Sequence, residues 1–462
     1  MKKVLILGGG VTGLRIAKYL LDSGYDVTIV EKSSTVGGMS KSFRYKDFIL
    51  DCGPHKFYTQ LPGVYDDYKE IIGEGEYLIV KKKNSLRLLG KYFDFPVKLS
   101  QLMININPVL SAQIMLDFIK AKFVKKKIVS YEDYFVKGFG EKGYGILFKG
   151  FAEKVWGNPK NISEELARKR SPASNIFDVI KSALKKDKNV SAESFYYPKK
   201  GCGVLCENLA SAIVGKKGKI LLNAVPQKIN LEKGKVVSVS VEAKNKTKTI
   251  PCDVLVSTAS IGEIPGLISP SLSQKTIDSM KKLKYRPLRI CFVFIKKKKV
   301  LEHNWVFFPE KEFCFNRVAE QKSFSPLTCP EDKTVITAEL TGSEDSEAYN
   351  SPDEDIKPLV LKDLEKAGII KKEDVYDFFS LKAKQVYPVY EIGYREYLSA
   401  VLEQLDKIEN LFSVGRLGLF NYNNIDHCLD MAKVVSEIIT KNKGRSEWKK
   451  ARDYFDGYRI VD

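Results

Sequence analysis

Three glycines and one carboxylate near the start of the chain have the types and spacing that hold a dinucleotide. Gly8, Gly10 and Gly13 fit the pattern G-x-G-x-x-G, and Glu31 follows them. Gly8 permits a tight turn, Gly10 lets a pyrophosphate approach the backbone, and Gly13 lets a helix pack closely on a strand. A carboxylate at the position of Glu31 can accept hydrogen bonds from ribose hydroxyls. A glycine-rich turn without a ligand is the alternative explanation of the pattern.

The segments around these residues supply the elements that must position them. One apolar run at residues 4–7 precedes the glycines, and a second at residues 27–30 ends on Glu31. The segment between them is amphipathic, with an apolar face made of Leu14, Ala17, Leu20 and Leu21. We therefore expect a strand, a glycine turn, a helix and a strand. The helix would begin at Val11 and Thr12, where unpaired N–H groups and a partial positive charge favour phosphate. This context makes an unliganded turn the weaker explanation.

A second glycine pair follows soon after the acid. Gly37 and Gly38 lie in the segment 32–40, where a domain that binds NAD needs no glycine. FAD lies extended, so its phosphates and ribityl chain need a second close approach to the backbone, which only glycine allows without a Cβ clash. The sequence therefore predicts FAD as the cofactor. The residues of this segment expected to contact it are Lys32, Gly37, Gly38, Met39 and Ser40.

Several segments resemble the large amine-oxidase superfamily of flavoproteins. They are the second glycine segment at 32–40, the strands that close the FAD domain at 218–225 and 252–259, and the last FAD-contacting strand at 412–416. The resemblance implies that Val225, Gly415 and Arg416 contact FAD. It also implies a helix from about Asp426 whose N-terminus points at the flavin ring, where its dipole favours an anionic reduced flavin.

Within that superfamily the chain resembles the UDP-galactopyranose mutases and the related protoporphyrinogen-oxidase-like proteins. The blocks that carry the likeness are residues 51–57, 91–96, 148–157, 316–318 and 415–417, together with Tyr422. Outside the glycines, the block 148–157 is the most specific match, since it is similar to the mutases' Lys-Gly-Tyr-Thr-Glu-Lys-Gln-Trp-Gly. The resemblance implies catalytic positions at His55, Arg317, Tyr387 and Tyr422, and substrate-binding positions at Trp156, Arg170 and Tyr390.

Several of these residues also have a structural alternative. His55 can be a packed histidine, Trp156 a core anchor and Arg317 half of an internal ion pair. The remaining alternatives are simple packing of Tyr387, Tyr390 and Tyr394, and helix capping by His427. One departure from the mutases bears on the substrate. Their second arginine for the nucleotide diphosphate is replaced here by Ser174, and a diphosphate needs charge-assisted donors. Arg170 or Lys169 can substitute for it.

The length of 462 residues suits two intertwined domains. We expect an α/β fold with a Rossmann-like FAD-binding domain of the glutathione-reductase type and an interleaved α+β substrate domain. The FAD-binding domain is predicted at 1–60, 196–265 and 396–462, and the substrate domain at 61–195 and 266–395. The segment 61–195 is predicted to be mainly helical, with helices at 99–123, 131–151 and 173–184.

Composition excludes several classes of protein. The hydrophobic content of 44% is that of an ordinary globular protein, and no apolar run is long enough for a membrane-spanning helix. The first strand begins directly after Met1, Lys2 and Lys3, so we expect no signal peptide. The eight cysteines form no C-x-x-C pair and there are three histidines, so we expect no metal cluster and reduced thiols in a cytoplasmic protein.

The net charge of +19 has three interpretations. It can reflect solvated lysine-rich faces, attraction of an anionic small-molecule substrate, or contact with an acidic membrane surface. Nucleic-acid binding has no supporting motif. Residues 95–123 are rich in Leu, Ile and Met, and lysines interrupt or follow them at positions 120, 122 and 125–127. This segment predicts either an interfacial helix at the inner face of a membrane or a cover of the substrate domain. The oligomeric state is left open.

The predicted function is that of an FAD-dependent oxidoreductase of the protoporphyrinogen-oxidase and amine-oxidase-like superfamily. Its flavin N5 would take a hydride, and oxygen or a quinone would reoxidise it. From the family likeness we expect a role in cell-surface glycan or lipid biosynthesis. One alternative is a mutase-like enzyme, in which N5 of reduced FAD forms an adduct with a nucleotide sugar and a pyranose becomes a furanose. A second alternative is a non-catalytic flavin-bound scaffold.

Overall fold

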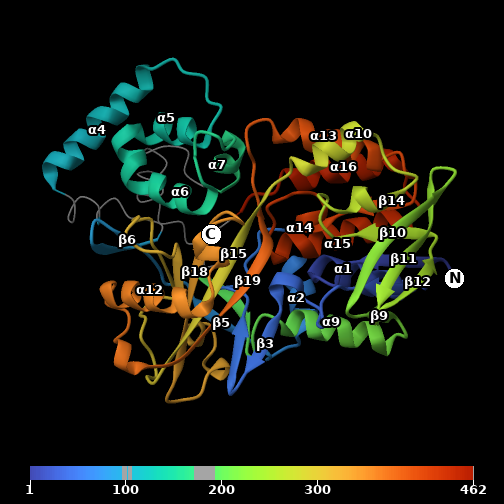
Figure 1. Ribbon diagram of the computed structural model, residues 1–462, viewed down its shortest axis with the longest axis horizontal. Helices are drawn as coiled ribbons and strands as arrows, with labels where there is room; N and C mark the ends of the chain where they lie inside the picture. The colour runs from blue at the N-terminus through green and yellow to red at the C-terminus, as the bar shows by residue number, and fades with distance from the viewer. Residues whose placement is uncertain (96–100, 102–106, 171–192, 461–462) are drawn as a thin grey trace.

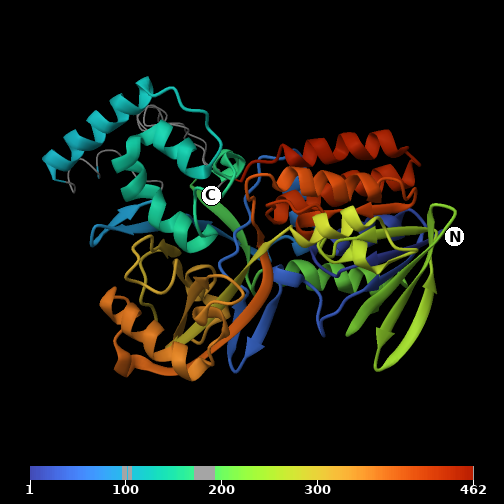
Figure 2. The ribbon, with the colours of Figure 1, turned by 45° about the horizontal axis from the view of Figure 1, so that its top comes forward.

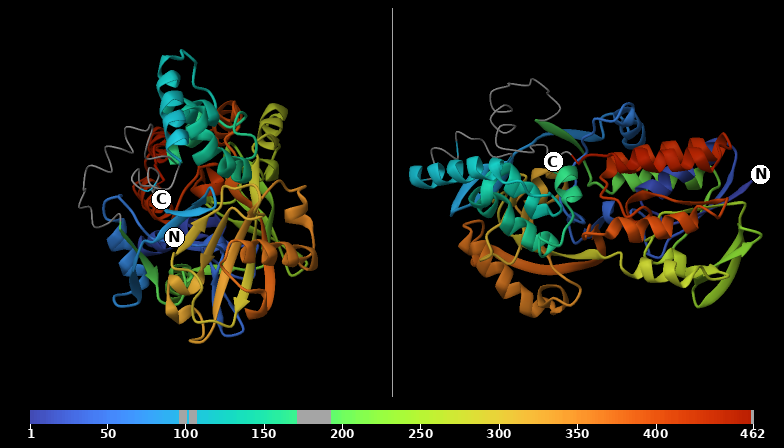
Figure 3. Two further views of the ribbon diagram at one scale, coloured as in Figure 1. Left: turned by 90° about the vertical axis from the view of Figure 1, so that its left-hand side faces the viewer. Right: turned by 90° about the horizontal axis from the view of Figure 1, so that it is seen from above.

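The computed structural model describes residues 1–95, 101, 107–170 and 193–460. Figure 1 shows two lobes. The parallel-sheet lobe carries the N-terminus and is built on a five-stranded sheet, and the seven-stranded lobe is built on a larger sheet. Helices α4 to α7 form a helical group on the seven-stranded lobe, which Figures 2 and 3 show from other sides.

The five-stranded sheet gathers strands from the start, the middle and the end of the chain. Its order is β20-β13-β1-β2-β9, and all its pairings are parallel. The strands are β1 (Lys3–Leu7), β2 (Asp26–Val30), β9 (Lys219–Leu221), β13 (Val254–Ser257) and β20 (Leu411–Ser413). The apolar runs at 4–7 and 27–30 are therefore strands, as the sequence predicts, and the Rossmann-like fold class is confirmed.

Helices cover this sheet through the apolar faces predicted for them. Helix α1 (Val11–Asp22) packs against both α9 (Val204–Gly215) and α15 (Ile425–Thr440). Leu14, Ala17 and Leu20 of α1 are buried. Helix α15 begins one residue before the predicted start at Asp426. Two further helices of this lobe are α2 (Val64–Ile72) and α16 (Arg445–Asp456).

A four-stranded sheet, β12-β11-β10-β14, lies at the edge of the parallel-sheet lobe (Figure 1). Its strands are β10 (Ala224–Glu232), β11 (Lys235–Ala243), β12 (Lys246–Pro251) and β14 (Ile268–Ser269). The segment 218–225, which the sequence suggests as one strand, is thus divided between two sheets. The chain turns at Asn223, whose φ of 51° lies in the left-handed region that asparagine tolerates.

The seven-stranded sheet has the order β19-β15-β18-β17-β16-β6-β7. Its strands are β6 (Asn84–Leu88), β7 (Lys91–Asp94), β15 (Tyr285–Ile295), β16 (Trp305–Phe307), β17 (Arg317–Glu320), β18 (Thr334–Thr341) and β19 (Val375–Pro388). The expectation that 61–195 is mainly helical is therefore wrong for residues 77–94, which form three strands after helix α2. Leu89 and Gly90 have φ of 52° and 76° and form a tight hairpin turn, and β6 also pairs in parallel with β16, far along the chain.

The helical group consists of α4 (Pro108–Phe123), α5 (Tyr131–Tyr144), α6 (Gly150–Trp156) and α7 (Glu164–Arg170). The predicted helix at 131–151 is interrupted, because Gly140 has a non-helical φ of 75° and a π-helical turn occupies Gly145–Lys149. The predicted helix at 173–184 and Ser174 lie outside the described residues.

The remaining elements are β3 (Ser42–Tyr45), β4 (Phe48–Asp51), β5 (Tyr77–Lys81), β8 (Ser194–Pro198), α10 (Gln274–Lys281), α11 (Glu347–Asn350), α12 (Asp353–Lys366), α13 (Tyr394–Leu405) and α14 (Gly415–Gly418). None of the helices in the described ranges combines the length and the apolar content that crossing a bilayer requires.

Candidate active site

A cavity of about 710 Å³ lies where the two lobes and the helical group meet. Thirteen of the fifteen residues predicted to bind the cofactor line it: Gly8, Gly10, Val11, Thr12, Glu31, Lys32, Gly37, Gly38, Met39, Ser40, Val225, Gly415 and Arg416. All four predicted catalytic residues line it as well, namely His55, Arg317, Tyr387 and Tyr422. Of the three predicted substrate-binding residues, only Arg170 does so.

On one side of this cavity the wall is the bare backbone of two glycine segments. Gly10 and Gly37 form a parallel bridge, and the N–H of Gly37 donates to the carbonyl of Gly9 at 2.8 Å. A Cβ built on Gly10 would meet no atom within 4 Å, so it would enter open space. Gly37 and Gly38 have φ of 110° and 56°, which favours glycine at both positions. A diphosphate can therefore approach this backbone closely.

Gly8 and Gly13 have a different role, which is packing. A Cβ on Gly13 would lie 2.1 Å from the carbonyl oxygen of Gly8, and a Cβ on Gly8 would lie 2.3 Å from Oγ1 of Thr258. Both distances are far below van der Waals contact. Glycine at position 13 therefore allows α1 to start directly against the β1 turn, and Gly13 does not line the cavity.

Glu31 is held rigidly at the nucleotide end of the cavity. It is 7% exposed, and its two carboxylate oxygens accept hydrogen bonds from the N–H groups of Gly9, at 2.7 Å, and Ser33, at 2.8 Å. Each oxygen keeps a further lone pair for a ribose hydroxyl.

Two further observations fit a bound dinucleotide. The N-cap of α1 is Gly10, and within the described chain no side chain caps this helix end, so the first-turn N–H groups at Val11 and Thr12 remain available to phosphate. In the same described part, Oδ1 of Asn423 is buried beside the cavity and accepts no hydrogen bond. The residues present therefore fit FAD.

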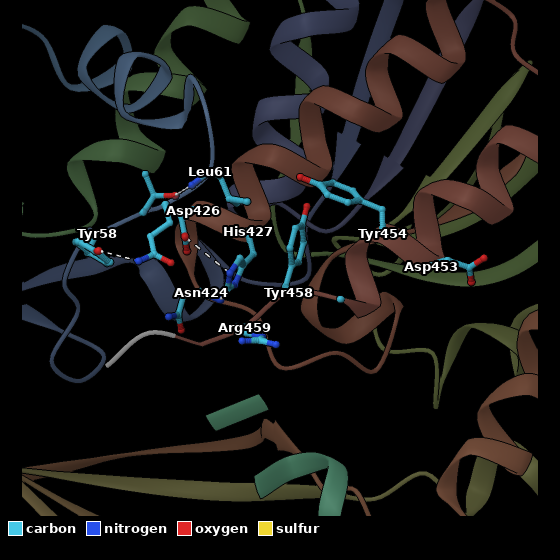
Figure 4. Close-up of a pocket in the computed structure, with 12 residues that line it drawn as sticks. Tyr58, Leu61, Asn424, Asp426, His427, Asp453, Tyr454, Tyr458 and Arg459 are labelled. Atoms are coloured by element: carbon cyan, nitrogen blue, oxygen red, sulfur yellow. Dashed lines mark hydrogen bonds and ion pairs between the residues drawn. The ribbon is translucent and has the colours of Figure 1, made fainter. Parts of the chain in front are cut away.

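Asp426 lies in a neighbouring pocket of about 370 Å³, at the N-terminus of α15 (Figure 4). Its carboxyl group is buried, and burial raises its pKa. His427 lies next to it, and Nδ1 of His427 accepts a hydrogen bond from the N–H of Asn424 at 3.1 Å. Asn424 and His427 thus form a capping box, and His427 has the helix-capping role given above as its structural alternative.

His55 lines the cavity, and the protonation of its two ring nitrogens is defined by one hydrogen bond. Its Nδ1 lies 2.9 Å from the carbonyl oxygen of Gly53, which can only accept, so Nδ1 carries the proton and Nε2 carries a lone pair. Burial lowers the pKa of His55, against the opposing effect of Asp51. We therefore expect a neutral imidazole at pH 7 that accepts a hydrogen bond from a ligand.

Arg317 both lines the cavity and forms an internal ion pair. It lies on β17 directly opposite Glu339 on β18, and its Nε and Nη2 donate to the two carboxylate oxygens at 2.9 and 2.7 Å. Glu339 is 1% exposed. Burial disfavours the charge of Arg317, but Glu339 outweighs it and holds the arginine's pKa above its ordinary value. The neighbouring backbone at Gly53 has φ 103°, and a Cβ there would lie 2.8 Å from Oε1 of Glu339.

Tyr387, Tyr422 and Trp156 form an aromatic cluster beside the cavity. The two tyrosine rings stack with centroids 5.6 Å apart and an interplanar angle of 7°. Trp156 meets each of them edge-on at 5.7 Å, but it is 1% exposed and lies behind them. Trp156 is therefore a core anchor of the tyrosine pair, not a wall of the cavity.

Two arginines from distant segments lie on this cluster. Arg416 sits 4.5 Å from the ring centroid of Tyr422 and donates to the carbonyls of Val386 and Asn423. Arg170 sits 5.0 Å from the same ring, and its Nη1 donates to the Tyr422 hydroxyl at 2.9 Å. A pair of guanidinium groups over stacked tyrosines is suited to an anionic ligand with a planar or sugar portion.

Tyr390 is buried behind the cluster and is hydrogen-bonded to Tyr422. Its hydroxyl accepts from the N–H of Tyr422 at 3.1 Å and donates to Oδ1 of Asn421 at 3.0 Å, and the residue is 1% exposed. Tyr394 stacks on it with centroids 4.4 Å apart. Packing, the alternative given for these tyrosines, accounts for both.

One group of potential metal ligands exists among the described residues. The ligand atoms of Asp51, His55 and Cys202 lie within 4.8 Å of one another. Asp51 already accepts hydrogen bonds from Ser42 and Tyr197. Burial raises the pKa of the Cys202 thiol well above its usual range, so the group is arranged as a hydrogen-bond network.

Several cavity residues were not found from the sequence: Lys56, Glu263, Leu288, Trp305, Phe307, Glu339 and Gln385. Lys56 lies in the block 51–57 without an assigned role, and no local motif marks the others. Glu339 lies within an apolar strand, and only the register between β17 and β18 brings it to Arg317. Lys56 directly follows His55, and its ammonium lies 5.7 Å from the ring centroid of Trp305.

Comparison with known proteins agrees with this arrangement. Residues 6–71 match the model of an NAD(P)-binding Rossmann-like domain, and residues 161–413 match that of the flavin containing amine oxidoreductases. Protoporphyrinogen oxidase 2, chloroplastic/mitochondrial, of Arabidopsis thaliana is 23% identical over 458 residues, covering 88% of this chain and 87% of that protein.

Two other similarities involve mutases. A probable UDP-galactopyranose mutase of Klebsiella pneumoniae is 26% identical over 186 residues, which cover 38% of this chain and 47% of that protein. The crystal structure of a reduced UDP-galactopyranose mutase superposes with a TM-score of 0.85 at 17% identity, covering 100% of this chain and 98% of the other, and so shares its fold. With the family model spanning more than half of the chain, and with a cavity that fits FAD, the protein is an FAD-dependent enzyme that belongs to the family of flavin containing amine oxidoreductases.

Proposed function

We propose that this enzyme binds an anionic sugar nucleotide and interconverts its pyranose and furanose forms while its FAD is reduced. The observation that carries the proposal is the pair of guanidinium groups, Arg170 and Arg416, on the stacked rings of Tyr387 and Tyr422. Two guanidiniums match the charge of a diphosphate. Among the relatives, the probable mutase of Klebsiella pneumoniae carries this activity in its name.

The charge of the cavity also argues against a simple amine as substrate. Cationic side chains outnumber acidic ones along its wall: Lys32, Lys56, Arg170, Arg317 and Arg416 against Glu31, Glu263 and Glu339. An alkylammonium group would be repelled from the substrate side, where Glu339 is already paired with Arg317. An anionic substrate would be attracted into it.

The side chains present have defined tasks in such a reaction. When bound, FAD supplies either hydride acceptance in its oxidised form or a nucleophilic nitrogen in its reduced form. Arg170 and Arg416 would hold the nucleotide diphosphate, and the tyrosine pair would support the sugar. The lone pair on Nε2 of His55 would accept a hydrogen bond from a sugar hydroxyl. Interconversion of the two ring forms involves no net oxidation, and the furanose product would serve cell-surface glycan assembly.

A second candidate is hydride transfer from an anionic substrate with a large apolar body. It is favoured by the apolar side chains Leu288, Trp305 and Phe307 on the cavity wall and by the loss of one positive charge to the Arg317–Glu339 pair. The Arabidopsis thaliana relative is named as an oxidase of a protoporphyrinogen. Oxygen or a quinone would then be the oxidant.

One anaerobic comparison separates the candidates. Purified holoenzyme, either oxidised or reduced with dithionite, is incubated with UDP-galactopyranose, and the sugar nucleotides are separated by liquid chromatography. Furanose formed only by the reduced enzyme supports the mutase proposal. If neither form makes furanose, while protoporphyrinogen bleaches the flavin absorbance and oxygen restores it, the oxidase replaces it. If neither substrate reacts, a flavin-bound scaffold becomes the better interpretation.

A further inference from the structure

Helix α4 exposes an apolar stripe instead of burying one. Residues at every third or fourth position form the stripe: Val109, Ala112, Leu116, Ile119 and Phe123, with Met115 beside it. The exposed fractions are 64% for Val109, 57% for Leu116, 47% for Ile119 and 81% for Phe123. On the opposite side Phe118 is 2% exposed, and α4 packs against α5 there. The outward face of α4 is thus apolar, which is the reverse of an ordinary surface helix.

Lysines surround the C-terminal end of this stripe. Lys120, Lys122, Lys125 and Lys127 are all exposed, and the neighbouring Lys126 pairs with Asp133 at 2.6 Å. The acidic group within the helix, Asp117, is turned toward α5, where it accepts from the N–H of Lys142 at 3.2 Å. The stripe and these lysines together are called the α4 surface below. Its charge is strongly positive where its apolar side chains end.

Among the residues that the structure describes, α4 lies where a large flat partner can reach its outward face. Figures 1 and 2 show α4 at the outer end of the helical group, on the far side from the parallel-sheet lobe. The view from above in Figure 3 agrees. With 16 residues, α4 is shorter than the roughly 20 residues that span a bilayer.

We propose that the α4 surface docks this enzyme on a bilayer that contains anionic phospholipids. The apolar stripe would lie at the boundary between headgroups and acyl chains, as amphipathic interfacial helices do. The lysines would extend their ammonium groups to the lipid phosphates. The charge complementarity favours this partner over a second copy of the chain, since lipid phosphates can pair with the lysines, whereas the acidic group of a second α4, Asp117, is turned toward α5. The proposal does not depend on the reaction that the enzyme catalyses.

Vesicle flotation of the FAD-loaded enzyme tests the proposal. We expect binding to vesicles of phosphatidylcholine mixed with phosphatidylglycerol, weak binding to phosphatidylcholine alone, and loss of binding at high salt. Leu116→Asn combined with Ile119→Asn should reduce the partition coefficient by about tenfold or more. Lys125→Gln combined with Lys127→Gln should also reduce it, by about 25-fold, because each lysine near an anionic surface contributes about fivefold.

Matched controls come from exposed apolar residues elsewhere. Val214, on the parallel-sheet lobe, is 60% exposed, and Leu327, in a 3-10 turn, is 59% exposed. The double substitution Val214→Asn with Leu327→Asn should leave the partition coefficient unchanged. The flavin absorbance of each variant reports whether the fold is intact. Unchanged binding of the α4 variants to anionic vesicles would overturn the proposal. A second result would also overturn it. Light scattering would show that the wild type is a dimer and that Leu116→Asn with Ile119→Asn converts it to a monomer, and flotation would show that neither the wild type nor any variant binds vesicles.

Discussion

Replacing Gly10 with valine would separate cofactor binding from folding. Gly10 has φ −78° and ψ 179°, an extended conformation that valine adopts readily. Its Cβ would enter open space, so the polypeptide without FAD has no steric reason to unfold. The main cost to the protein is a poorer N-cap residue, which amounts to about 1 kcal/mol or less. The isopropyl group would instead occupy the space through which a diphosphate approaches the backbone.

The size of the effect follows from the bonds that would be lost. Displacing the diphosphate would break at least two hydrogen bonds from the N–H groups of the first turn of α1. Each bond to a charged acceptor contributes about 1.5–3 kcal/mol, so the affinity for FAD should fall by roughly 100-fold or more. Purified Gly10→Val should be colourless, and titration of the apoprotein with FAD should give the weaker dissociation constant.

Gly13 supplies the matched control. A Cβ at Gly13 would collide with the carbonyl oxygen of Gly8 at 2.1 Å, so Gly13→Ala should lower the thermal stability of the apoprotein as well as its FAD content. Gly10→Val should leave the melting temperature of the apoprotein within a few degrees of wild type. A yellow, fully loaded Gly10→Val protein would refute the assignment of the glycine segments to the diphosphate. Equal destabilisation of both apoproteins would refute the distinction between them.

Three further outcomes follow from the site. Arg317→Met should destabilise the protein by about 3 kcal/mol in urea unfolding, because it leaves Glu339 buried and unpaired. Adding Glu339→Gln should recover most of that stability but not turnover, and a double variant as unstable as the single one would contradict this. Arg416→Lys should raise the KM for an anionic substrate by about tenfold with FAD retained, since the compact ammonium lacks the rigid fork with which a guanidinium donates to several separated acceptors at once; an unchanged KM would remove it from the substrate site. Burial lowers the pKa of all three histidines. Below pH 6.5 the unfolded chain binds more protons than the folded one, so stability should fall with decreasing pH and should fall less steeply in His55→Asn.

The sequence predicts the nucleotide end of the site well because its signals are local. The glycines, the helix N-terminus and Glu31 lie in one short segment, so spacing alone places them together. The seven-stranded sheet could not be predicted in the same way. Residues 84–86 of β6 pair with residues 305–307 of β16, which lie far along the chain. No periodicity within residues 77–94 indicates that partner.

For a related reason, the sequence does not show which of the implied substrate-binding side chains reach the cavity. The resemblance led to Trp156 and Tyr390 as binding residues, but both are turned into the core, and their contribution is to hold Tyr387 and Tyr422 in place. Glu339 was missed because its meaning depends on the register that pairs it with Arg317. Family likeness identifies positions, whereas the direction of a side chain depends on the packing around it.

The three arginines of the cavity have different surroundings. The charge of Arg317 is compensated by Glu339, and this ion pair joins β17 to β18 at the wall of the cavity. Arg170 and Arg416 meet on one ring, that of Tyr422, from α7 in the helical group and from α14 in the parallel-sheet lobe. Next to Arg170, Lys169 donates to Asn421 and Asp456 of the parallel-sheet lobe. The distance between the two guanidiniums therefore depends on how the helical group is attached to the parallel-sheet lobe. A ligand that bridges both arginines would bind only when that attachment is formed.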